Sequence, residues 1–383
     1  MDFPIKDTIQ DCNLNFLVGS GLSCPYLSTL GRIEFLLTQL EKAEVPDHFR
    51  ALISCSLYKA YFDGVMSKNC KILGDDPGAE PFLNAYCDLV KAINAILLQR
   101  KSTILGKEAN VFTTNIDIFL EKAIERIGLD CNDGFNGRFE PWFAISNFKK
   151  SHFKRSPQYD NVSELPTINL IKLHGSLTWQ MKGIDRIVFS SDLTHVRNIQ
   201  TKIVTPSLLL QIDENVAFDA LVAGCEGMKL DATVGEFLLA YDDLAIVNPT
   251  KAKFAQTLLN QTHYELLRIY SNELEKENTV LFVFGFSFAD EHIREITLRA
   301  ANSNPTLMIY IVAYDSNSAA EIRAKFPPIH TRNDNIKLIR PPVDKDQIDV
   351  FKYDLPTINK KLRQFFESRG SDLAPAPASA GTT

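Results

Sequence analysis

Four short polar strings in this sequence each follow an apolar run, and together they offer glycine turns, hydroxyls, amides, carboxylates and one imidazole. The strings are Gly19-Ser20-Gly21-Leu22-Ser23, Thr113-Thr114-Asn115-Ile116-Asp117, Leu173-His174-Gly175 and Gly285-Phe286-Ser287-Phe288, which Asp290 follows. Such apolar runs are typical of buried parallel strands, whose carboxyl ends meet at one edge of a sheet. We therefore expect the four loops to form one site at that edge, where open α/β sheets bind ligands.

The first string suits a diphosphate. Gly19 and Gly21 allow a tight turn and a close backbone approach, and a helix that follows would offer free N–H groups. Ser20 and Ser23 add hydroxyls. Cys24 stands where the third glycine of the common dinucleotide fingerprint would be, so an ordinary turn explains this string equally well.

The second and third strings carry the candidate reactive groups. Thr113, Asn115 and Asp117 suit a ribose hydroxyl and an amide, although a helix cap is an alternative that explains one of them. Among seven histidines, only His174 lies between an apolar strand and a glycine. An imidazole placed there could act as a general base on a ribose hydroxyl or water, and a core or capping histidine is the alternative.

The fourth string contains another glycine turn. Gly285 and Ser287 are candidates for contact with an adenosine ribose or phosphate, because the preceding run is the most apolar strand of the sequence. Asp290, with Glu291, is predicted to cap the next helix. We expect Phe288, and Phe286 with it, to belong to the core.

The wider pattern predicts an α/β fold, a Rossmann-like and mostly parallel sheet with a helical insertion. We expect one domain over residues 1–366 and a disordered tail over 367–383. The helical insertion covers about 29–107 and a further insertion about 180–240, of which 189–240 is the least readable part. Strands are predicted at 13–18, 110–113, 168–173, 244–247, 279–284 and 307–313, a hairpin at 176–188, a loop at 130–162, and helices at 254–277, after Asp290 and after Asp315.

Composition excludes several classes of protein. The 41 basic and 47 acidic side chains give a net charge of -6, so no global basic field attracts nucleic acid. The seven cysteines are scattered without a CxxC pair, which predicts no zinc ribbon and no metal site. The amino terminus lacks a signal peptide and no run reaches the length of a membrane span, so we expect a cytoplasmic protein. A GxxxxGK[ST] phosphate loop is absent as well.

In this order the strings resemble the sirtuins, from about residue 13 to about residue 315. The matching residues are Gly19, Gly21, Ser23, Thr113, Asn115, Ile116, Asp117, His174, Gly175, Gly285 and Ser287. The zinc module and the G-I-P-x-F-R segment of protein-deacylating sirtuins are missing. The run Gly285–Ile293 is similar to that of the bacterial sirtuin-like proteins of antiphage defence, which hydrolyse NAD.

This resemblance implies a function and a set of roles. NAD would be the substrate, with its diphosphate near Gly19–Ser23 and its adenosine ribose near Gly285 and Ser287. Asn115 would position a water, His174 would accept its proton, and Asp117 would hold the carboxamide. The chain resembles the stand-alone subunits that pair with a HerA-type ring ATPase, and a homo-oligomer is expected.

Three other functions stay open at this point. The first is an NAD or ADP-ribose sensor that assembles without turnover. The second is nucleic-acid processing within an ATPase complex, for which Lys149, Lys150, His152, Lys154 and Arg155 would supply charge, although such charges are most often a solvated face. The third is deacylation without zinc.

Overall fold

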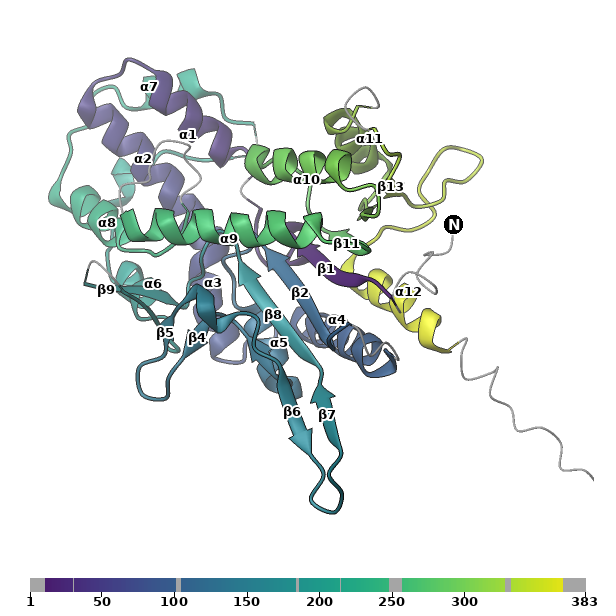
Figure 1. Ribbon diagram of the computed structural model, residues 1–383. Helices are drawn as coiled ribbons and strands as arrows, with labels where there is room; N and C mark the ends of the chain where they lie inside the picture. Colours follow the sequence, from purple (N-terminus) through teal and green to yellow (C-terminus); the bar gives the residue numbers. More distant parts are fainter. Residues whose placement is uncertain are drawn as a thin grey trace, which may run out of the picture.

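A seven-stranded parallel sheet forms the centre of the computed structural model (Figure 1). Its strands are β1 (Asn13–Val18), β2 (Glu108–Thr113), β3 (Cys131–Asn132), β8 (Thr167–Lys172), β11 (Thr279–Phe284), β12 (Met308–Val312) and β13 (Ile336–Ile339). The order is β13-β12-β11-β1-β2-β8-β3. The structure describes residues 11–29, 31–100, 105–183, 186–213, 215–247, 257–327 and 332–367.

The strand order contains one reversal, between β1 and β11. From β1 the chain proceeds outward through β2 to β8, and it later returns to the other side of β1 with β11, β12 and β13. Apart from β3, this is the order of dinucleotide-binding folds, which bind ligands at the reversal. The predicted fold class, an α/β protein with a Rossmann-like parallel sheet, is confirmed.

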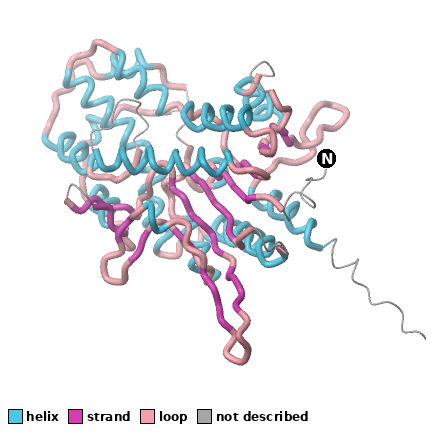
Figure 2. The backbone as a smooth tube through the Cα atoms, in the orientation of Figure 1, coloured by secondary structure: helices cyan, strands magenta, loops and turns pink. Residues whose placement is uncertain are grey.

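Helices cover both faces of the sheet because each strand buries both sets of its alternating side chains. Phe16 of β1 lies in the core that includes α4 (Glu80–Gln99), α5 (Phe119–Ile127) and α12 (Leu355–Glu367). Leu17 lies in the opposite core, with α9 (Thr257–Glu275), α10 (Glu291–Ser303) and α11 (Ser316–Lys325). Figure 2 shows the sheet between these two layers.

Helices fill most of the chain between β1 and β2, where the helical insertion is predicted. They are α1 (Ile33–Lys42), α2 (Asp47–Tyr61), the π-helical turn η2 (Phe62–Met66), α3 (Ser67–Leu73) and α4. The prediction that no run reaches the length of a membrane span is wrong for helix α4, which has that length and composition, although 56% of its most apolar window is buried in the fold. That burial is what a core helix of a globular domain requires, and one such helix is weak evidence for a membrane span.

Several smaller predictions need correction or extension. Residues 244–247 are not a strand, because Ile246 makes only an isolated bridge to Gly175. The hairpin near 176–188 is confirmed as β9 (Trp179–Lys182) and β10 (Arg186–Phe189). The region 130–162, predicted as a loop, contains short strands: β3, β4 (Phe135–Asn136), β5 (Trp142–Phe143) and β6 (His152–Arg155), which pairs with β7 (Val162–Leu165) in a projecting hairpin (Figure 1).

The least readable part of the sequence is partly helical. Its elements are α6 (Thr194–Gln200), the 3-10 turn η4 (Pro206–Leu208), α7 (Phe218–Gly224) and α8 (Ala232–Asp242). Two further 3-10 turns, η1 (Ser20–Leu22) and η3 (Ile145–Asn147), lie earlier in the chain. The predicted disordered tail lies, from residue 368 on, outside the described residues.

Four buried asparagines form a ladder across the sheet. Asn15, Asn110, Asn169 and Asn132 occupy paired positions on β1, β2, β8 and β3. Asn110 donates to Asn15 at 2.8 Å, Asn169 to Asn110 at 2.8 Å, and Asn132 to Asn169 at 3.0 Å. A shift of one residue in any strand would leave buried amides unpaired, so the ladder selects one register.

We predict that Asn110→Ala destabilises the fold by about 2–4 kcal/mol, because the buried side-chain oxygen of Asn15 loses its donor and the side-chain nitrogen of Asn169 keeps only its bond to Glu108. Urea unfolding followed by circular dichroism measures the change. Asn84→Ala on the exposed side of α4 is the matched control and should change the free energy of unfolding by less than about 0.5 kcal/mol. Equal effects of the two substitutions would contradict the role of the ladder.

Candidate functional site

The loops after β1 and β11 touch through their backbones at the reversal of strand order. The N–H of Gly19 donates to the carbonyl of Phe284 at 2.9 Å, and the N–H of Gly21 donates to the carbonyl of Gly285 at 3.0 Å. A Cβ atom on Gly19 would lie 2.4 Å from the Gly285 oxygen, and Gly285 has a φ of +61°. These glycines are therefore required for the contact between the two loops.

This contact changes the expectation of a diphosphate cradle. Only the three-residue turn η1 follows β1 directly, and the N–H groups of Leu22 and Ser23 are bonded to the carbonyls of Gly19 and Ser20. The predicted set of free N–H groups is thus largely occupied within the loop. Ser20 and Gly21 are exposed, so the outer side of the turn is accessible.

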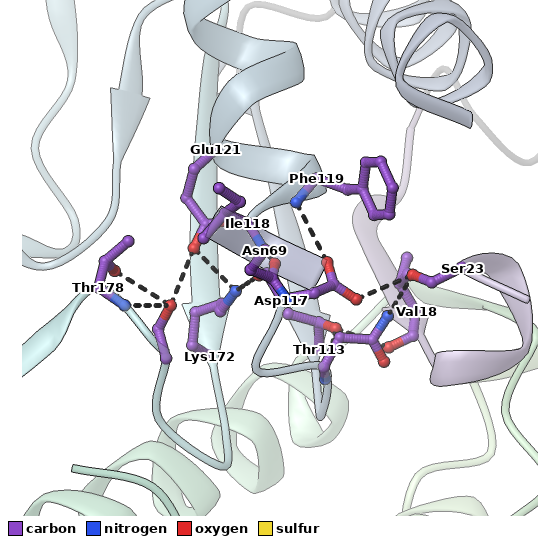
Figure 3. A network of polar contacts seen from close by, with 12 residues as sticks. Val18, Ser23, Asn69, Thr113, Asp117, Ile118, Phe119, Glu121, Lys172 and Thr178 are labelled. Carbon is purple, nitrogen blue, oxygen red and sulfur yellow. Dashed lines mark hydrogen bonds and ion pairs between the residues drawn. The ribbon is translucent and has the colours of Figure 1, made fainter. Parts of the chain in front are cut away.

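Ser23 belongs to a buried hydrogen-bond network, in which its hydroxyl points toward Asp117 (Figure 3). It is 1% exposed, and its hydroxyl donates to Oδ2 of Asp117 at 2.8 Å. The Tyr86 hydroxyl lies 2.8 Å from Ser23 Oγ, and the Asn115 amide donates to the same oxygen at 3.5 Å. The first and second sequence strings therefore meet as predicted, with α4 supplying Tyr86, which the sequence analysis missed.

Asp117 is occupied within the protein. Its Oδ1 accepts from the N–H of Phe119, the first residue of α5, at 3.1 Å, although the N-cap of this helix is Ile118. Burial raises the pKa of its carboxyl group, against the lowering effects of Lys172 and of the Ser23 hydrogen bond. Each carboxylate oxygen already accepts one hydrogen bond from within the protein, and the side chain is 5% exposed.

The side chain of Asn115 is buried, and its oxygen can still accept a hydrogen bond. Its N–H is bonded to Thr113 Oγ1 at 3.0 Å, and Thr113 in turn donates to the carbonyl of Val18 at 2.8 Å. These bonds hold the turn rigidly at the end of β2. The side-chain oxygen of Asn115 has no hydrogen-bond partner in the described structure, although the residue is only 6% exposed. Such an unpaired acceptor costs about 1–3 kcal/mol, which a ligand hydroxyl or a water could recover.

His174 is held by a carboxylate from the far side of the site. Its Nε2 lies 2.9 Å from Oδ2 of Asp290. His174 follows β8 and Asp290 follows β11, so this pair joins loops whose strands are separated by β2 and β1. Asp290 also accepts from the N–H of Ile293 at 3.2 Å, which confirms it as the cap of α10. The sequence analysis predicted the cap and missed the bond to His174.

A second histidine supports the same loop. His263 of α9 places Nδ1 2.7 Å from the carbonyl of Leu173, and its ring centroid is 5.9 Å from that of His174. Burial lowers the pKa of His263, which favours the neutral form of its ring. Nothing in the amphipathic pattern of α9 distinguishes this histidine from a core residue, so the sequence analysis missed it.

The remaining predicted residues lie in the fourth loop, and they differ in exposure. Ser287 is exposed, and its carbonyl accepts from the Lys325 ammonium at 2.8 Å. Phe288 is fully buried, which confirms its predicted place in the core. Its ring centroid lies 4.8 Å from that of Phe326. Phe286 is half-buried against Phe288.

An ion pair between Lys172 and Glu121 connects the second and third loops (Figure 3). The Lys172 ammonium lies 2.8 Å from a Glu121 carboxylate oxygen and also donates to the backbone carbonyl of Asp117. Ser176 donates to the same Glu121 oxygen at 3.1 Å. The pair ties the Asn115 turn to the His174 turn.

Metal chemistry has no evident ligands here. Among the described residues, no group of three or more histidine, cysteine, aspartate or glutamate side chains could hold a metal ion. No protein-family model matches the sequence, and no curated protein matches it.

We predict that Gly19→Ala lowers the free energy of unfolding by about 2 kcal/mol or more, because its Cβ would overlap the Gly285 carbonyl. Gly235→Ala in α8 is the control, since nothing lies within 4 Å of its added Cβ. There alanine should stabilise by up to about 1 kcal/mol through helix propensity. Thermal and urea unfolding measure both, and a neutral Gly19→Ala would disprove the close contact.

A second prediction concerns acid stability. Burial alone would raise the pKa of Asp290, but the hydrogen bond and charge of His174 lower it to about 2. A lowered pKa stabilises the fold above the unfolded pKa of about 4, and this stabilisation is lost as the pH falls toward 2. The stability difference between wild type and Asp290→Asn should therefore shrink by about 1 kcal/mol from pH 5 to pH 3.

Urea unfolding at pH 5, 4 and 3 checks this difference. The same comparison in a His174→Ala background is the control, and there the pH dependence should be weaker because the partner of Asp290 is gone. A pH-independent difference in the wild-type background would show that Asp290 is not held as described.

Proposed function

We propose that this protein is an NAD hydrolase that converts NAD and water to nicotinamide, ADP-ribose and a proton. The observation that carries the proposal is the meeting of four polar loops at the one reversal of the parallel sheet, where open α/β folds bind ligands. Those loops supply an unpaired buried amide oxygen and a histidine paired with a carboxylate. These are the groups needed to orient and deprotonate a water.

Asn115 would supply the orienting group. Cleavage of the bond between nicotinamide and ribose develops oxocarbenium character, so a water must stand at the anomeric carbon. The free side-chain oxygen of Asn115 can accept a hydrogen bond from that water or from a ribose hydroxyl. Its backbone is held by Thr113, which limits the orientations that the amide can take.

His174 would act as the general base. If Nε2–H donates to Asp290, the neutral ring presents Nδ1 as an acceptor for the proton of water. Asp290 then positions the ring and stabilises the imidazolium that forms, as the carboxylate of a hydrolase triad does. The exposed Ser20, Gly21 and Ser287 would contact the diphosphate and the adenosine ribose.

The biological role belongs to the same proposal. NAD depletion would make the protein an effector of antiphage defence, and a HerA-type ring ATPase would be its partner in a complex in which this chain forms a homo-oligomer. The resemblance of the strings Gly19–Ser23, Thr113–Asp117, Leu173–Gly175 and Gly285–Ile293 to sirtuin-like defence proteins supports this role.

One observation favours nucleic-acid contact as a second candidate. The β6–β7 hairpin projects from the fold (Figure 1) and carries Lys154 and Arg155, and Phe153 beside them is 60% exposed. Positive charge beside an exposed ring suits a nucleic-acid backbone and its bases. A DNA affinity that falls steeply with salt and is lost in Lys154→Gln/Arg155→Gln would support it.

We predict that Asn115→Ala and His174→Ala each reduce nicotinamide release by about a hundredfold or more, the usual contribution of a general base and its positioned water. Asp290→Asn should reduce release by about tenfold or more and shift its pH profile, since it acts through His174. Chromatography of NAD incubations, alone and with a ring ATPase, measures the products.

The exposed His48→Ala in α2 is the matched histidine control and should keep full activity. Circular dichroism melts check that each variant is folded. Full activity in either Asn115→Ala or His174→Ala would contradict their roles. Calorimetric NAD binding without nicotinamide release in the wild type would instead identify a sensor.

A further inference from the structure

A cavity lies beside α11 at the carboxyl end of β13. Its volume is about 620 Å³, within the range of small-molecule sites. One wall is a face of α11 that includes Ser316, Ala319 and Arg323, and the floor is the end of β13 with Leu338 and Ile339. The chain after β13 and helix α12 close the remaining sides.

Positive charge dominates this cavity. Arg323, Arg340 and Lys361 line it, and none of its described lining residues is acidic, although the chain as a whole carries a net charge of -6. In the described structure none of the three cations lies within 4 Å of a carboxylate. The three come from α11, the end of β13 and α12, so the tertiary structure gathers them from separate elements.

Two carboxylates next to the α11 wall of the cavity are engaged in other contacts. Asp349 accepts from the N–H of Ser316 at 3.0 Å and from its hydroxyl. Asp315 caps α11 through the N–H of Ser318 at 2.9 Å and pairs with Lys352. The cations of the cavity are therefore left for an anion from outside.

The cavity also offers an apolar and aromatic surface. The rings of Phe351 and Tyr353 pack edge to face, with their centroids 5.1 Å apart. The Lys361 ammonium lies 5.9 Å from the Phe351 ring centroid. Pro341 and Pro342 continue this surface. A ligand with one flat ring and one anionic group would find a partner for each.

We propose that this cavity is a second ligand site, which binds a phosphorylated ring compound of the nucleoside monophosphate class. The guanidinium groups of Arg323 and Arg340, with the Lys361 ammonium, receive the phosphate, because planar guanidinium groups match phosphate oxygens in pairs. The Phe351 and proline surface receives the ring. None of the residues that line the cavity belongs to the site that contains His174, and the inference does not depend on NAD cleavage.

The wall of this cavity is connected to the candidate active site. Lys325, in the last turn of α11, donates to the Ser287 carbonyl, and Phe326 packs against Phe288. Both contacts reach the loop that leads to Asp290. A ligand on α11 therefore touches the helix that supports this loop.

Isothermal titration of the purified full-length protein with AMP tests the proposal. We predict saturable binding that weakens about tenfold or more in Arg323→Gln/Arg340→Gln, because each removed guanidinium loses a charged hydrogen bond. Both arginines are exposed, so the variant should fold normally, which a circular dichroism melt checks. Lys361→Gln should weaken binding as well.

Lys360→Gln, on the same helix, is the matched control. Lys360 is exposed and does not line the cavity, so this variant should bind AMP like the wild type. Adenosine should bind far more weakly than AMP, and ribose 5-phosphate should lie between them. Wild-type affinity in the double arginine variant, or equal affinity for adenosine and AMP, would overturn the proposal, and neither result bears on nicotinamide release.

Discussion

The register of the parallel sheet is the constraint on which the rest of the structure depends. The ladder of Asn15, Asn110, Asn169 and Asn132 pairs buried amides across four strands. A shift of the strand register would break these hydrogen bonds and leave the amides unpaired in an apolar core. Beyond β1 the ladder stops, because β11 places Leu281 opposite Asn15. With the strands so aligned, their carboxyl ends lie level, and four loops distant in sequence meet at one edge.

The glycine loops show how a sequence motif can have a packing role. Gly19, Gly21 and Gly285 allow the loops after β1 and β11 to bond backbone to backbone, and side chains at these positions would overlap them. This close contact is compatible with ligand binding on the exposed side of the turn. The packing of these two neighbouring loops therefore requires glycine in both of them, whether or not a ligand binds.

The candidate site combines polar groups that are committed to internal hydrogen bonds with a buried amide oxygen that has no partner among the described residues. Ser23, Asp117 and Thr113 are committed to internal hydrogen bonds, which makes the turn rigid, while the Asn115 side-chain oxygen stays buried and unpaired. His174 is oriented by Asp290 across the reversal of the sheet. A rigid frame around one free acceptor and one oriented imidazole suits a reaction in which water must be placed and deprotonated.

The sequence by itself determined the fold class, the main strands, the four loops and the caps at Asp290 and Asp315, because apolar runs and capping residues act over a few positions. It also favoured a strand at 244–247 that does not form, since a short apolar run without a neighbouring strand is buried as loop. Only the tertiary structure decided the strand order, the bond between His174 and Asp290, the support from His263 and Tyr86, and the gathering of Arg323, Arg340 and Lys361. Each of these joins residues whose separation along the chain leaves no periodic signal, so only the packing of whole elements brings them together.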